Sequence, residues 1–216
     1  MRWTLKTAAN KKKVNQLSND LSIDPILASL LVQRNIDSFK KAKEFFRPSL
    51  EDLHDPFLLK DMDRAVSRIE KAIIDNENIL IYGDYDVDGT TSVSLVSSYL
   101  KTITNHIATY IPDRYDEGYG ISYQGIDFAS DNNFSLIIAL DCGIKAIEKV
   151  NYATQKNVDF IICDHHKPGD EIPKALAVLN PKRVDCTYPY KELCGCGVGF
   201  KLVHALASRR GQTIED

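Results

Sequence analysis

Short apolar runs alternate with amphipathic segments from about residue 79 onward. The apolar runs that predict strands are 79–83, 106–111, 136–140, 158–163 and 175–179, and the segments that predict helices are 90–102, 122–131, 144–156 and 198–209. Short apolar strands that alternate with helices are typical of βαβ units, whose strands form a mostly parallel sheet. The predicted fold class is therefore α/β, with a mostly parallel sheet flanked by helices.

Residues 1–60 have a different character, with no alternating strand pattern. Asp24-Pro25 predicts a helix start, because proline fits the first helical turn, and Ser38 can cap a second short helix. A further helix is expected over 63–74, where the apolar positions recur on one face. We therefore expect a small helical N-terminal segment, residues 1–60, followed by an α/β domain, residues 61–216.

Ionisable side chains follow three of the predicted strands. In strand order they are Asp84, Asp86 and Asp88, then Asp141, then Asp164, His165 and His166. In open parallel sheets, ligands bind beyond the carboxyl ends of the strands, so these side chains occupy the expected position of a site. Three ionisable residues in succession at a strand exit are difficult to explain by packing. The pattern therefore predicts a metal site.

The ligand types narrow the choice of metal. If the first acidic segment stays extended, its three carboxylates point the same way and repel one another unless cations neutralise them. An EF-hand loop is excluded, because position twelve, counted from Asp84, is Leu95 rather than a bidentate acid. Mixed carboxylate and imidazole ligation favours Mn²⁺ or Mg²⁺ over structural zinc. Two such ions could activate a water molecule and clamp a phosphoryl oxygen.

Individual residues leave alternatives open. Asp141 could bridge two metals, or it could cap the helix expected to begin near Ile144. His165 and His166 alternate along the chain, so one of them is expected to face the metal. The glycine-rich turn 195–201 could offer free N–H groups to a phosphate, or its glycines could serve close helix–sheet packing.

Composition sets the broad class. Hydrophobic residues make up 44% and charged residues 26% of the chain, as in ordinary globular proteins. The net charge of −3 does not by itself indicate nucleic-acid binding. No apolar stretch approaches the ~18 residues of a membrane span, and the N-terminus lacks the apolar region of a signal peptide. Five scattered cysteines are typical of reduced thiols, so a cytoplasmic location is expected.

Four motifs together resemble those of the DHH phosphoesterase superfamily, over about residues 79–204. They are Asp84-Tyr85-Asp86-Val87-Asp88-Gly89, Asp141-Cys142-Gly143, Asp164-His165-His166 and the turn 195–201, which reads GCGVGFK. Within the superfamily the chain is most similar to the RecJ branch, the single-strand-specific 5′→3′ DNA exonucleases. The form of the first and fourth motifs and the segment 111–120 carry this likeness.

The resemblance implies Mn²⁺- or Mg²⁺-dependent hydrolysis of phosphodiester bonds from a 5′ end by a two-metal mechanism, in DNA repair and recombination. Single-stranded DNA is the implied partner, with a single-strand-binding protein or a helicase as further partners and no membrane. The implied roles are metal ligation by Asp86, Asp88, Asp141 and His165, catalysis by Asp84, Asp164 and His166, and substrate binding by Arg114, Gly197 and Lys201. Among the catalytic residues, His166 is expected to contact the scissile phosphate and Asp164 to orient a histidine.

The chain departs from the superfamily pattern in two places. Tyr82 stands where many members have a histidine ligand, which implies weaker binding of one metal or use of Asp84 instead. The superfamily also has a further aspartate ligand and C-terminal domains beyond the position of Asp216, so the expectation is an N-terminal portion with little activity alone. The alternative functions are a small-molecule DHH phosphodiesterase or pyrophosphatase and a non-catalytic replication scaffold of the Cdc45 type. Mn²⁺ binding would separate the scaffold from the enzymes.

Overall fold

Five parallel strands form one sheet in the computed structural model, which describes residues 2–213. In chain order they are β1 (Asn78–Gly83), β2 (Ile107–Tyr110), β3 (Phe134–Leu140), β4 (Asp159–Cys163) and β5 (Ala177–Leu179). Their order across the sheet is β2-β1-β3-β4-β5, and every neighbouring pair is parallel. The predicted α/β class and its five strands are therefore confirmed.

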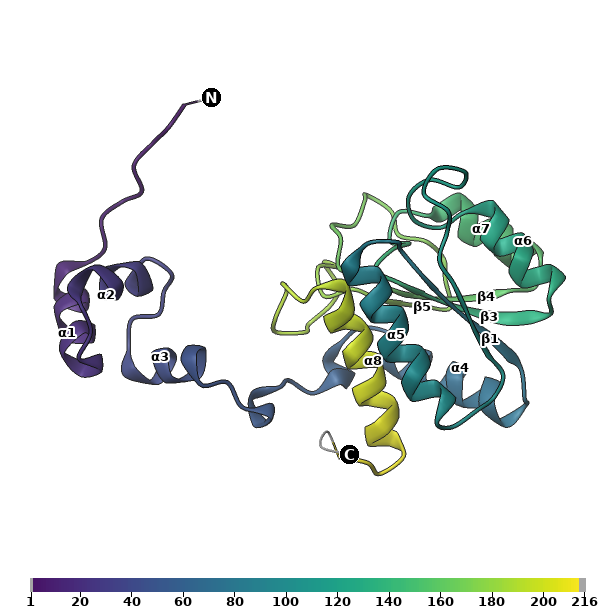
Figure 1. Cartoon of the computed structure of the whole chain (residues 1–216), viewed down its shortest axis with the longest axis horizontal. Coiled ribbons are helices and arrows are strands. Elements are labelled where there is room, and N and C mark those ends of the chain that lie inside the picture. Colours follow the sequence, from purple (N-terminus) through teal and green to yellow (C-terminus); the bar gives the residue numbers. More distant parts are fainter. Residues whose placement is uncertain (1, 214–216) are drawn as a thin grey trace. The chain divides into compact units, whose positions relative to one another are not determined.

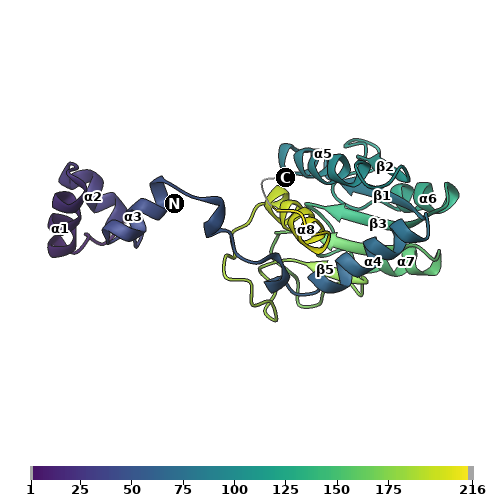
Figure 2. The same ribbon diagram turned by 90° about the horizontal axis from the view of Figure 1, so that it is seen from below.

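Helices cover both faces of the sheet (Figures 1 and 2). One face carries α4 (Met62–Ile74), α5 (Val87–Lys101) and α8 (Gly195–Arg209), and the other carries α6 (Tyr123–Asp131) and α7 (Ile147–Gln155). Successive residues of a strand point to opposite faces, so Ile79 and Ile81 pack into the first layer and Leu80 and Tyr82 into the second. Because both faces are buried, the strands are apolar throughout rather than alternating.

The structure forms two units, Met1–Leu53 and His54–Asp216. The first contains α1 (Lys11–Leu21), α2 (Pro25–Val32), α3 (Phe39–Phe46) and the 3₁₀ turn η1 (Leu50–Asp52); a second such turn, η2 (Pro56–Leu58), lies in the other unit.

The helix starts predicted in the first unit are confirmed. The Asp24 side chain accepts the Ile26 N–H at 2.7 Å, and that of Ser38 accepts the Lys41 N–H at 3.3 Å. The small core of this unit consists of Val14, Leu17, Ala28 and Leu31.

The strand order fixes where a site can form. β1 pairs with β2 on one side and with β3 on the other, so the chain direction across the sheet reverses between β1 and β3. Loops leave the carboxyl ends of these two strands in opposite directions, which opens a crevice at a topological switch point. Asp84 follows β1 and Asp141 follows β3, so both lie at that point.

In the described part of the chain, residues 2–213, no helix combines the length and the apolar character needed to cross a membrane.

Candidate metal centre

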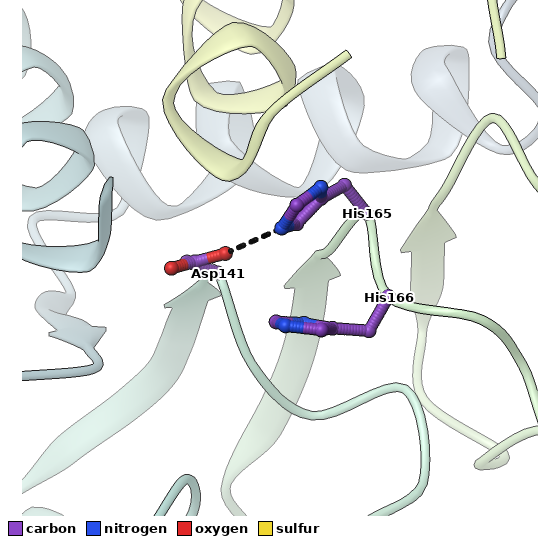
Figure 3. A group of neighbouring side chains, drawn as sticks. All are labelled: Asp141, His165 and His166. Carbon is purple, nitrogen blue, oxygen red and sulfur yellow. Dashed lines mark ion pairs between the residues drawn. The ribbon is translucent and has the colours of Figure 1, made fainter. Parts of the chain in front are cut away.

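Asp141, His165 and His166 form a cluster whose possible ligand atoms all lie within 4.8 Å of one another. Figure 3 shows both imidazoles projecting from the exit of β4 toward the side on which Asp141 lies. Nε2 of His165 is 3.2 Å from Oδ1 of Asp141 and 3.8 Å from Oδ2 of Asp88. The structure thus brings the exits of β1, β3 and β4 together, and both histidines reach the cluster.

Asp141, at the end of β3, adopts a left-handed backbone conformation. Its φ is 61°, its N–H donates to the Cys163 carbonyl at 2.8 Å, and its side chain is almost fully buried. Helix α7 begins only at Ile147, and Ala146 occupies the N-cap position. The alternative that Asp141 caps this helix is therefore wrong.

Asp164 organises the exit of β4. Its Oδ1 accepts the N–H groups of His165 at 2.7 Å and His166 at 3.0 Å, and it lies 2.8 Å from Nδ1 of His166. Its Oδ2 accepts the N–H of Ile144 at 2.9 Å, which ties the loop after β3 to the exit of β4. This buried carboxylate therefore fixes the orientation of the His166 ring and leaves its Nε2 directed outward.

The acidic segment after β1 does not stay extended, so its three carboxylates do not share one face. Helix α5 begins at Val87, three residues earlier than predicted, because the Asp86 side chain caps it by accepting the Gly89 N–H at 2.9 Å. Asp88 lies in the first helical turn, and its side chain is directed toward α8 instead.

The N-terminus of α8 binds the carboxylate of Asp88. Oδ2 accepts the Gly195 N–H at 2.6 Å and Oδ1 accepts the Cys196 N–H at 2.7 Å. The N–H of Gly197 bonds to Sγ of Cys194 at 3.2 Å. These three N–H groups are therefore bonded within the protein and are not free for a phosphate. Phosphate binding by this turn was one of the two alternatives that the sequence left open.

Lys201, predicted to bind substrate, is buried instead. Its ammonium group donates to the His54 carbonyl at 2.7 Å, and only 1% of the residue is exposed. The lysine stem lies on the inner face of α8, so packing rather than phosphate recognition accounts for it.

Asp84 is the carboxylate of this group that most needs a cation beside it. The residue is fully buried, no side chain of the described residues bonds to either carboxylate oxygen, and the backbone N–H groups of Tyr85 and Gly120 act against the effect of burial on its pKa. A buried carboxylate without a partner is costly, unless a cation compensates it. Gly89 allows the close approach here, because a Cβ at that position would lie 2.4 Å from the Asp84 carbonyl oxygen.

The electrostatics of the cluster support the same conclusion. Burial, and then the charges of Asp88 and Asp86, raise the pKa of Asp141 to about 7. Burial also raises the pKa of Asp84. Burial acts on Asp88 too, but the Cys196 and Gly195 N–H groups outweigh it and hold that pKa below its usual value.

No lysine or arginine within residues 2–213 forms an ion pair with Asp84, Asp86, Asp88 or Asp141. No lysine or arginine in this part of the chain therefore neutralises these four carboxylates, and a metal ion would do so. The carboxylate and imidazole donors fit Mn²⁺ or Mg²⁺.

Three further residues complete the surroundings of the cluster. The Tyr119 hydroxyl lies 3.4 Å from Nε2 of His166. Asn180, directly after β5, donates to the His166 carbonyl at 2.9 Å. Arg114 stacks over Tyr85, with its guanidinium carbon 5.1 Å from the ring centroid. Asn180 is not among the residues predicted from the sequence, although it too is a polar residue at a strand exit.

Tyr82 is directed away from the cluster. Its hydroxyl donates to the Gly120 carbonyl at 2.8 Å and accepts the Ser122 N–H at 3.1 Å, and its ring stacks on Tyr110. The side chain therefore holds the loop before α6 against the sheet and is not available as a ligand.

Replacing Gly195 with alanine is expected to disturb this centre. A Cβ at Gly195 would lie 2.2 Å from Oδ1 of Asp141, so either α8 or the carboxylate must move, at a cost of about 1–3 kcal/mol. Thermal unfolding should show this loss, and the stabilisation by Mn²⁺ should shrink with it. Gly197→Ala is the control from the same turn, since its Cβ would meet nothing closer than 3.4 Å. Equal behaviour of the two variants would contradict the close contact.

The chain belongs to the DHH family: the model of the DHH family, N-terminal domain, matches residues 78–216. It is similar to the single-stranded-DNA-specific exonuclease RecJ of Bacillus subtilis, with 45% identity over 95% of this chain and 26% of that protein. The RecJ of Escherichia coli is 34% identical over 85% of this chain and 31% of that protein. The chain therefore spans about a quarter to a third of these relatives.

Solved structures agree with this relationship. The crystal structure of exonuclease RecJ bound to manganese matches with a TM-score of 0.65 and 30% identity, over 71% of this chain and 39% of that one. RecJ from Thermus thermophilus in complex with Mn²⁺ matches with a TM-score of 0.76 and 25% identity, over 98% of this chain and 29% of that one. The chain thus corresponds to an N-terminal part of RecJ proteins.

Proposed function

We propose that this chain is the metal-binding catalytic part of a 5′→3′ exonuclease that hydrolyses single-stranded DNA. The observation that carries the proposal is the convergence of unpaired buried carboxylates and two histidines at the switch point of the sheet. The relatives named as single-stranded-DNA-specific exonucleases, and the solved RecJ structures with manganese, support the choice of substrate and metal.

The proposed ligands are Asp86, Asp88, Asp141 and His165, with Asp84 assisting either metal position. Asp141 and His165 are already 3.2 Å apart, and the α8 N–H groups hold Asp88 ionised beside them. Bound Mn²⁺ or Mg²⁺ would activate a water molecule and withdraw charge from the phosphoryl group.

His166 and Arg114 are proposed to act on the substrate. Asp164 fixes Nδ1 of His166, so its Nε2 can donate to an oxygen of the scissile phosphate when the ring is protonated. Arg114, on the exposed loop beside Tyr85, can add a phosphate contact with its planar guanidinium. We further predict a role in repair or recombination and a cytoplasmic location. The predicted partner protein is a single-strand-binding protein or a helicase.

The test is hydrolysis of single strands that carry a label at the 5′ or the 3′ end, with duplex DNA and a cyclic dinucleotide as comparison substrates. We expect Mn²⁺-dependent release of label from the 5′ end of single strands, and its loss in the Asp86→Ala variant. Because the chain spans only part of its relatives, the assay uses the full gene product beside residues 1–216. Hydrolysis of the dinucleotide alone would favour the small-molecule enzyme, and no hydrolysis with no Mn²⁺ binding would favour a scaffold.

Metal affinity should depend on pH through Asp141, whose pKa burial raises to about 7. A metal ion needs the ionised carboxylate, so below pH 7 we expect the apparent Mn²⁺ affinity to fall by about tenfold per pH unit. Without metal, the folded chain binds this proton more tightly than the unfolded chain. The free energy of unfolding should therefore decrease as pH rises from about 4 to about 7. Calorimetric titration at about pH 6 and about pH 8 checks the first effect, and equal affinities would contradict it.

A further inference from the structure

A cavity of about 280 Å³ lies beside His166, and neither Asp88 nor any residue of α8 lines it. The loop before α6, the loop after β3 and the exit of β4 form its wall, which consists of Tyr119, Gly120, Ile121, Cys142, Gly143, Ile144, Lys145, Ala146, Lys149, Asp164 and His166. The volume is just below the ~300–1,000 Å³ of small-molecule sites. A single nucleotide unit fits that size better than a longer stretch of strand.

One part of the wall suits a nucleobase. Ile121, Cys142 and Ile144 are buried and present an apolar surface. Tyr119 is 58% exposed, and its ring stands edge-on to His166 with 6.4 Å between the ring centroids. An exposed aromatic ring above an apolar floor is the surface on which single-stranded nucleic-acid sites stack their bases.

Another part of the wall suits a phosphate. Lys145 and Lys149 flank the first turn of α7, and neither forms an ion pair within residues 2–213. No side chain caps α7 at Ala146, so the N–H groups of the first turn have no side-chain acceptor. Glu148 lies on the same turn but does not line the cavity. Both lysines therefore line the cavity at the helix start, and the ammonium group of Lys149 also lies 5.9 Å from the centroid of the Tyr123 ring.

We propose that this cavity binds one nucleoside monophosphate, with the base against Tyr119 and the phosphate toward Lys145, Lys149 and the start of α7. The inference rests on the proposed nuclease function, because it places the terminal nucleotide of the strand, or the nucleotide released from it, next to His166. The terminal nucleotide and the released nucleotide both present a base and a phosphate. Comparing the affinity for a 5′-phosphorylated dinucleotide with that for the mononucleotide dAMP distinguishes them.

The lysines are tested by calorimetric binding of dAMP, deoxyadenosine and the dinucleotide pdApdA to residues 1–216. Lys145→Ala and Lys149→Ala should each weaken dAMP several-fold and together by about tenfold, and leave deoxyadenosine unchanged. Lys101→Ala, an exposed lysine at the opposite edge of the sheet, is the matched control and should change nothing. Tighter binding of pdApdA than of dAMP, with the same lysine dependence, assigns the cavity to the strand end; tighter dAMP binding assigns it to the product.

The aromatic wall is tested by a pair of variants at Tyr119. Tyr119→Ala should weaken dAMP and deoxyadenosine alike, by about tenfold, whereas Tyr119→Phe keeps the ring and should keep both affinities. Circular-dichroism melting and Mn²⁺ titration of each variant show that the fold and the metal centre are intact. Unchanged dAMP affinities in the variants at Lys145, Lys149 and Tyr119 would overturn the proposal.

Strand hydrolysis, measured in parallel, separates this proposal from the one on which it rests. If Mn²⁺-dependent hydrolysis occurs but dAMP affinity does not change in the variants at Lys145, Lys149 and Tyr119, the proposed subsite is wrong and the nuclease function stands. If dAMP binds as expected but the full gene product hydrolyses no DNA, the nuclease function is wrong and the nucleotide site stands.

Discussion

Replacing Asp164 with alanine is expected to lower the free energy of unfolding by about 3–6 kcal/mol. The side chain is 1% exposed and accepts the N–H groups of His165, His166 and Ile144. Removing it leaves the buried N–H of Ile144 and the partly buried N–H groups of His165 and His166 without this partner, and each buried donor left unpaired costs about 1–3 kcal/mol. Urea unfolding without metal measures this effect apart from any loss of metal binding.

The control for Asp164 is an acid on the following loop. Asp170 is exposed, so Asp170→Ala should change the stability by no more than about 0.5 kcal/mol. Asp164→Asn keeps the shape but weakens the acceptor, and should fall between the two. A loss below about 1 kcal/mol in Asp164→Ala would show that the exit of β4 does not depend on this carboxylate.

Replacing His166 with alanine is expected to slow strand hydrolysis by about 10²–10³-fold while Mn²⁺ binding persists. Its Nδ1 is held by Asp164, and its Nε2 faces the Tyr119 hydroxyl at the rim rather than a carboxylate. The side chain is thus placed to contact a phosphate, and a contact made in the transition state affects turnover more than binding. Steady-state kinetics with calorimetric Mn²⁺ titration checks both parts.

His165→Ala is the matched variant and should behave in the opposite way. Its Nε2 lies between Asp141 and Asp88, so its loss should weaken Mn²⁺ first and turnover as a consequence. His106→Ala, at the amino end of β2, should leave both quantities unchanged. Equal Mn²⁺ affinity in His165→Ala and His166→Ala would contradict the division of roles.

The strand exits could be predicted from the sequence, because an apolar run followed by acids gives a local signal. The order of the sheet then brings Asp84 and Asp141 to neighbouring strands, as parallel α/β folds require. The clustering of Asp141 with His165 follows from this sheet order. These features depend on residues near one another in the chain and on general rules of the fold.

The remaining features depend on distant contacts. Asp88 bonds to Gly195 and Cys196, more than a hundred residues away, and no local pattern indicates that pairing. The glycine-rich start of α8 is typical of an anion-binding turn. The anion that it binds is the carboxylate of Asp88 rather than a phosphate. The family resemblance implies substrate binding by Lys201, although helix periodicity places this residue on the buried face of α8.

The early start of α5 has a similar cause. The sequence pattern predicts Asp86 as a metal ligand in an extended segment, whereas its side chain also caps α5. Aspartate is among the residues preferred at that position, so the cap could have been predicted from the sequence. The contact between Tyr119 and His166 could not, because it needs the loop that Tyr82 anchors.

The most direct measurement of the central claim is the melting temperature of residues 1–216 during a Mn²⁺ titration, for the unchanged chain and for Asp141→Ala. If the strand exits form a metal centre, Mn²⁺ stabilises the unchanged chain by about 2.7 kcal/mol at a hundred times its dissociation constant. Asp141 lies within reach of both histidines and shares His165 with Asp88, so its removal should abolish most of this gain. Two results would contradict the metal centre. One is a melting temperature of the unsubstituted chain that stays constant up to millimolar Mn²⁺, and the other is an equal rise in melting temperature in both proteins.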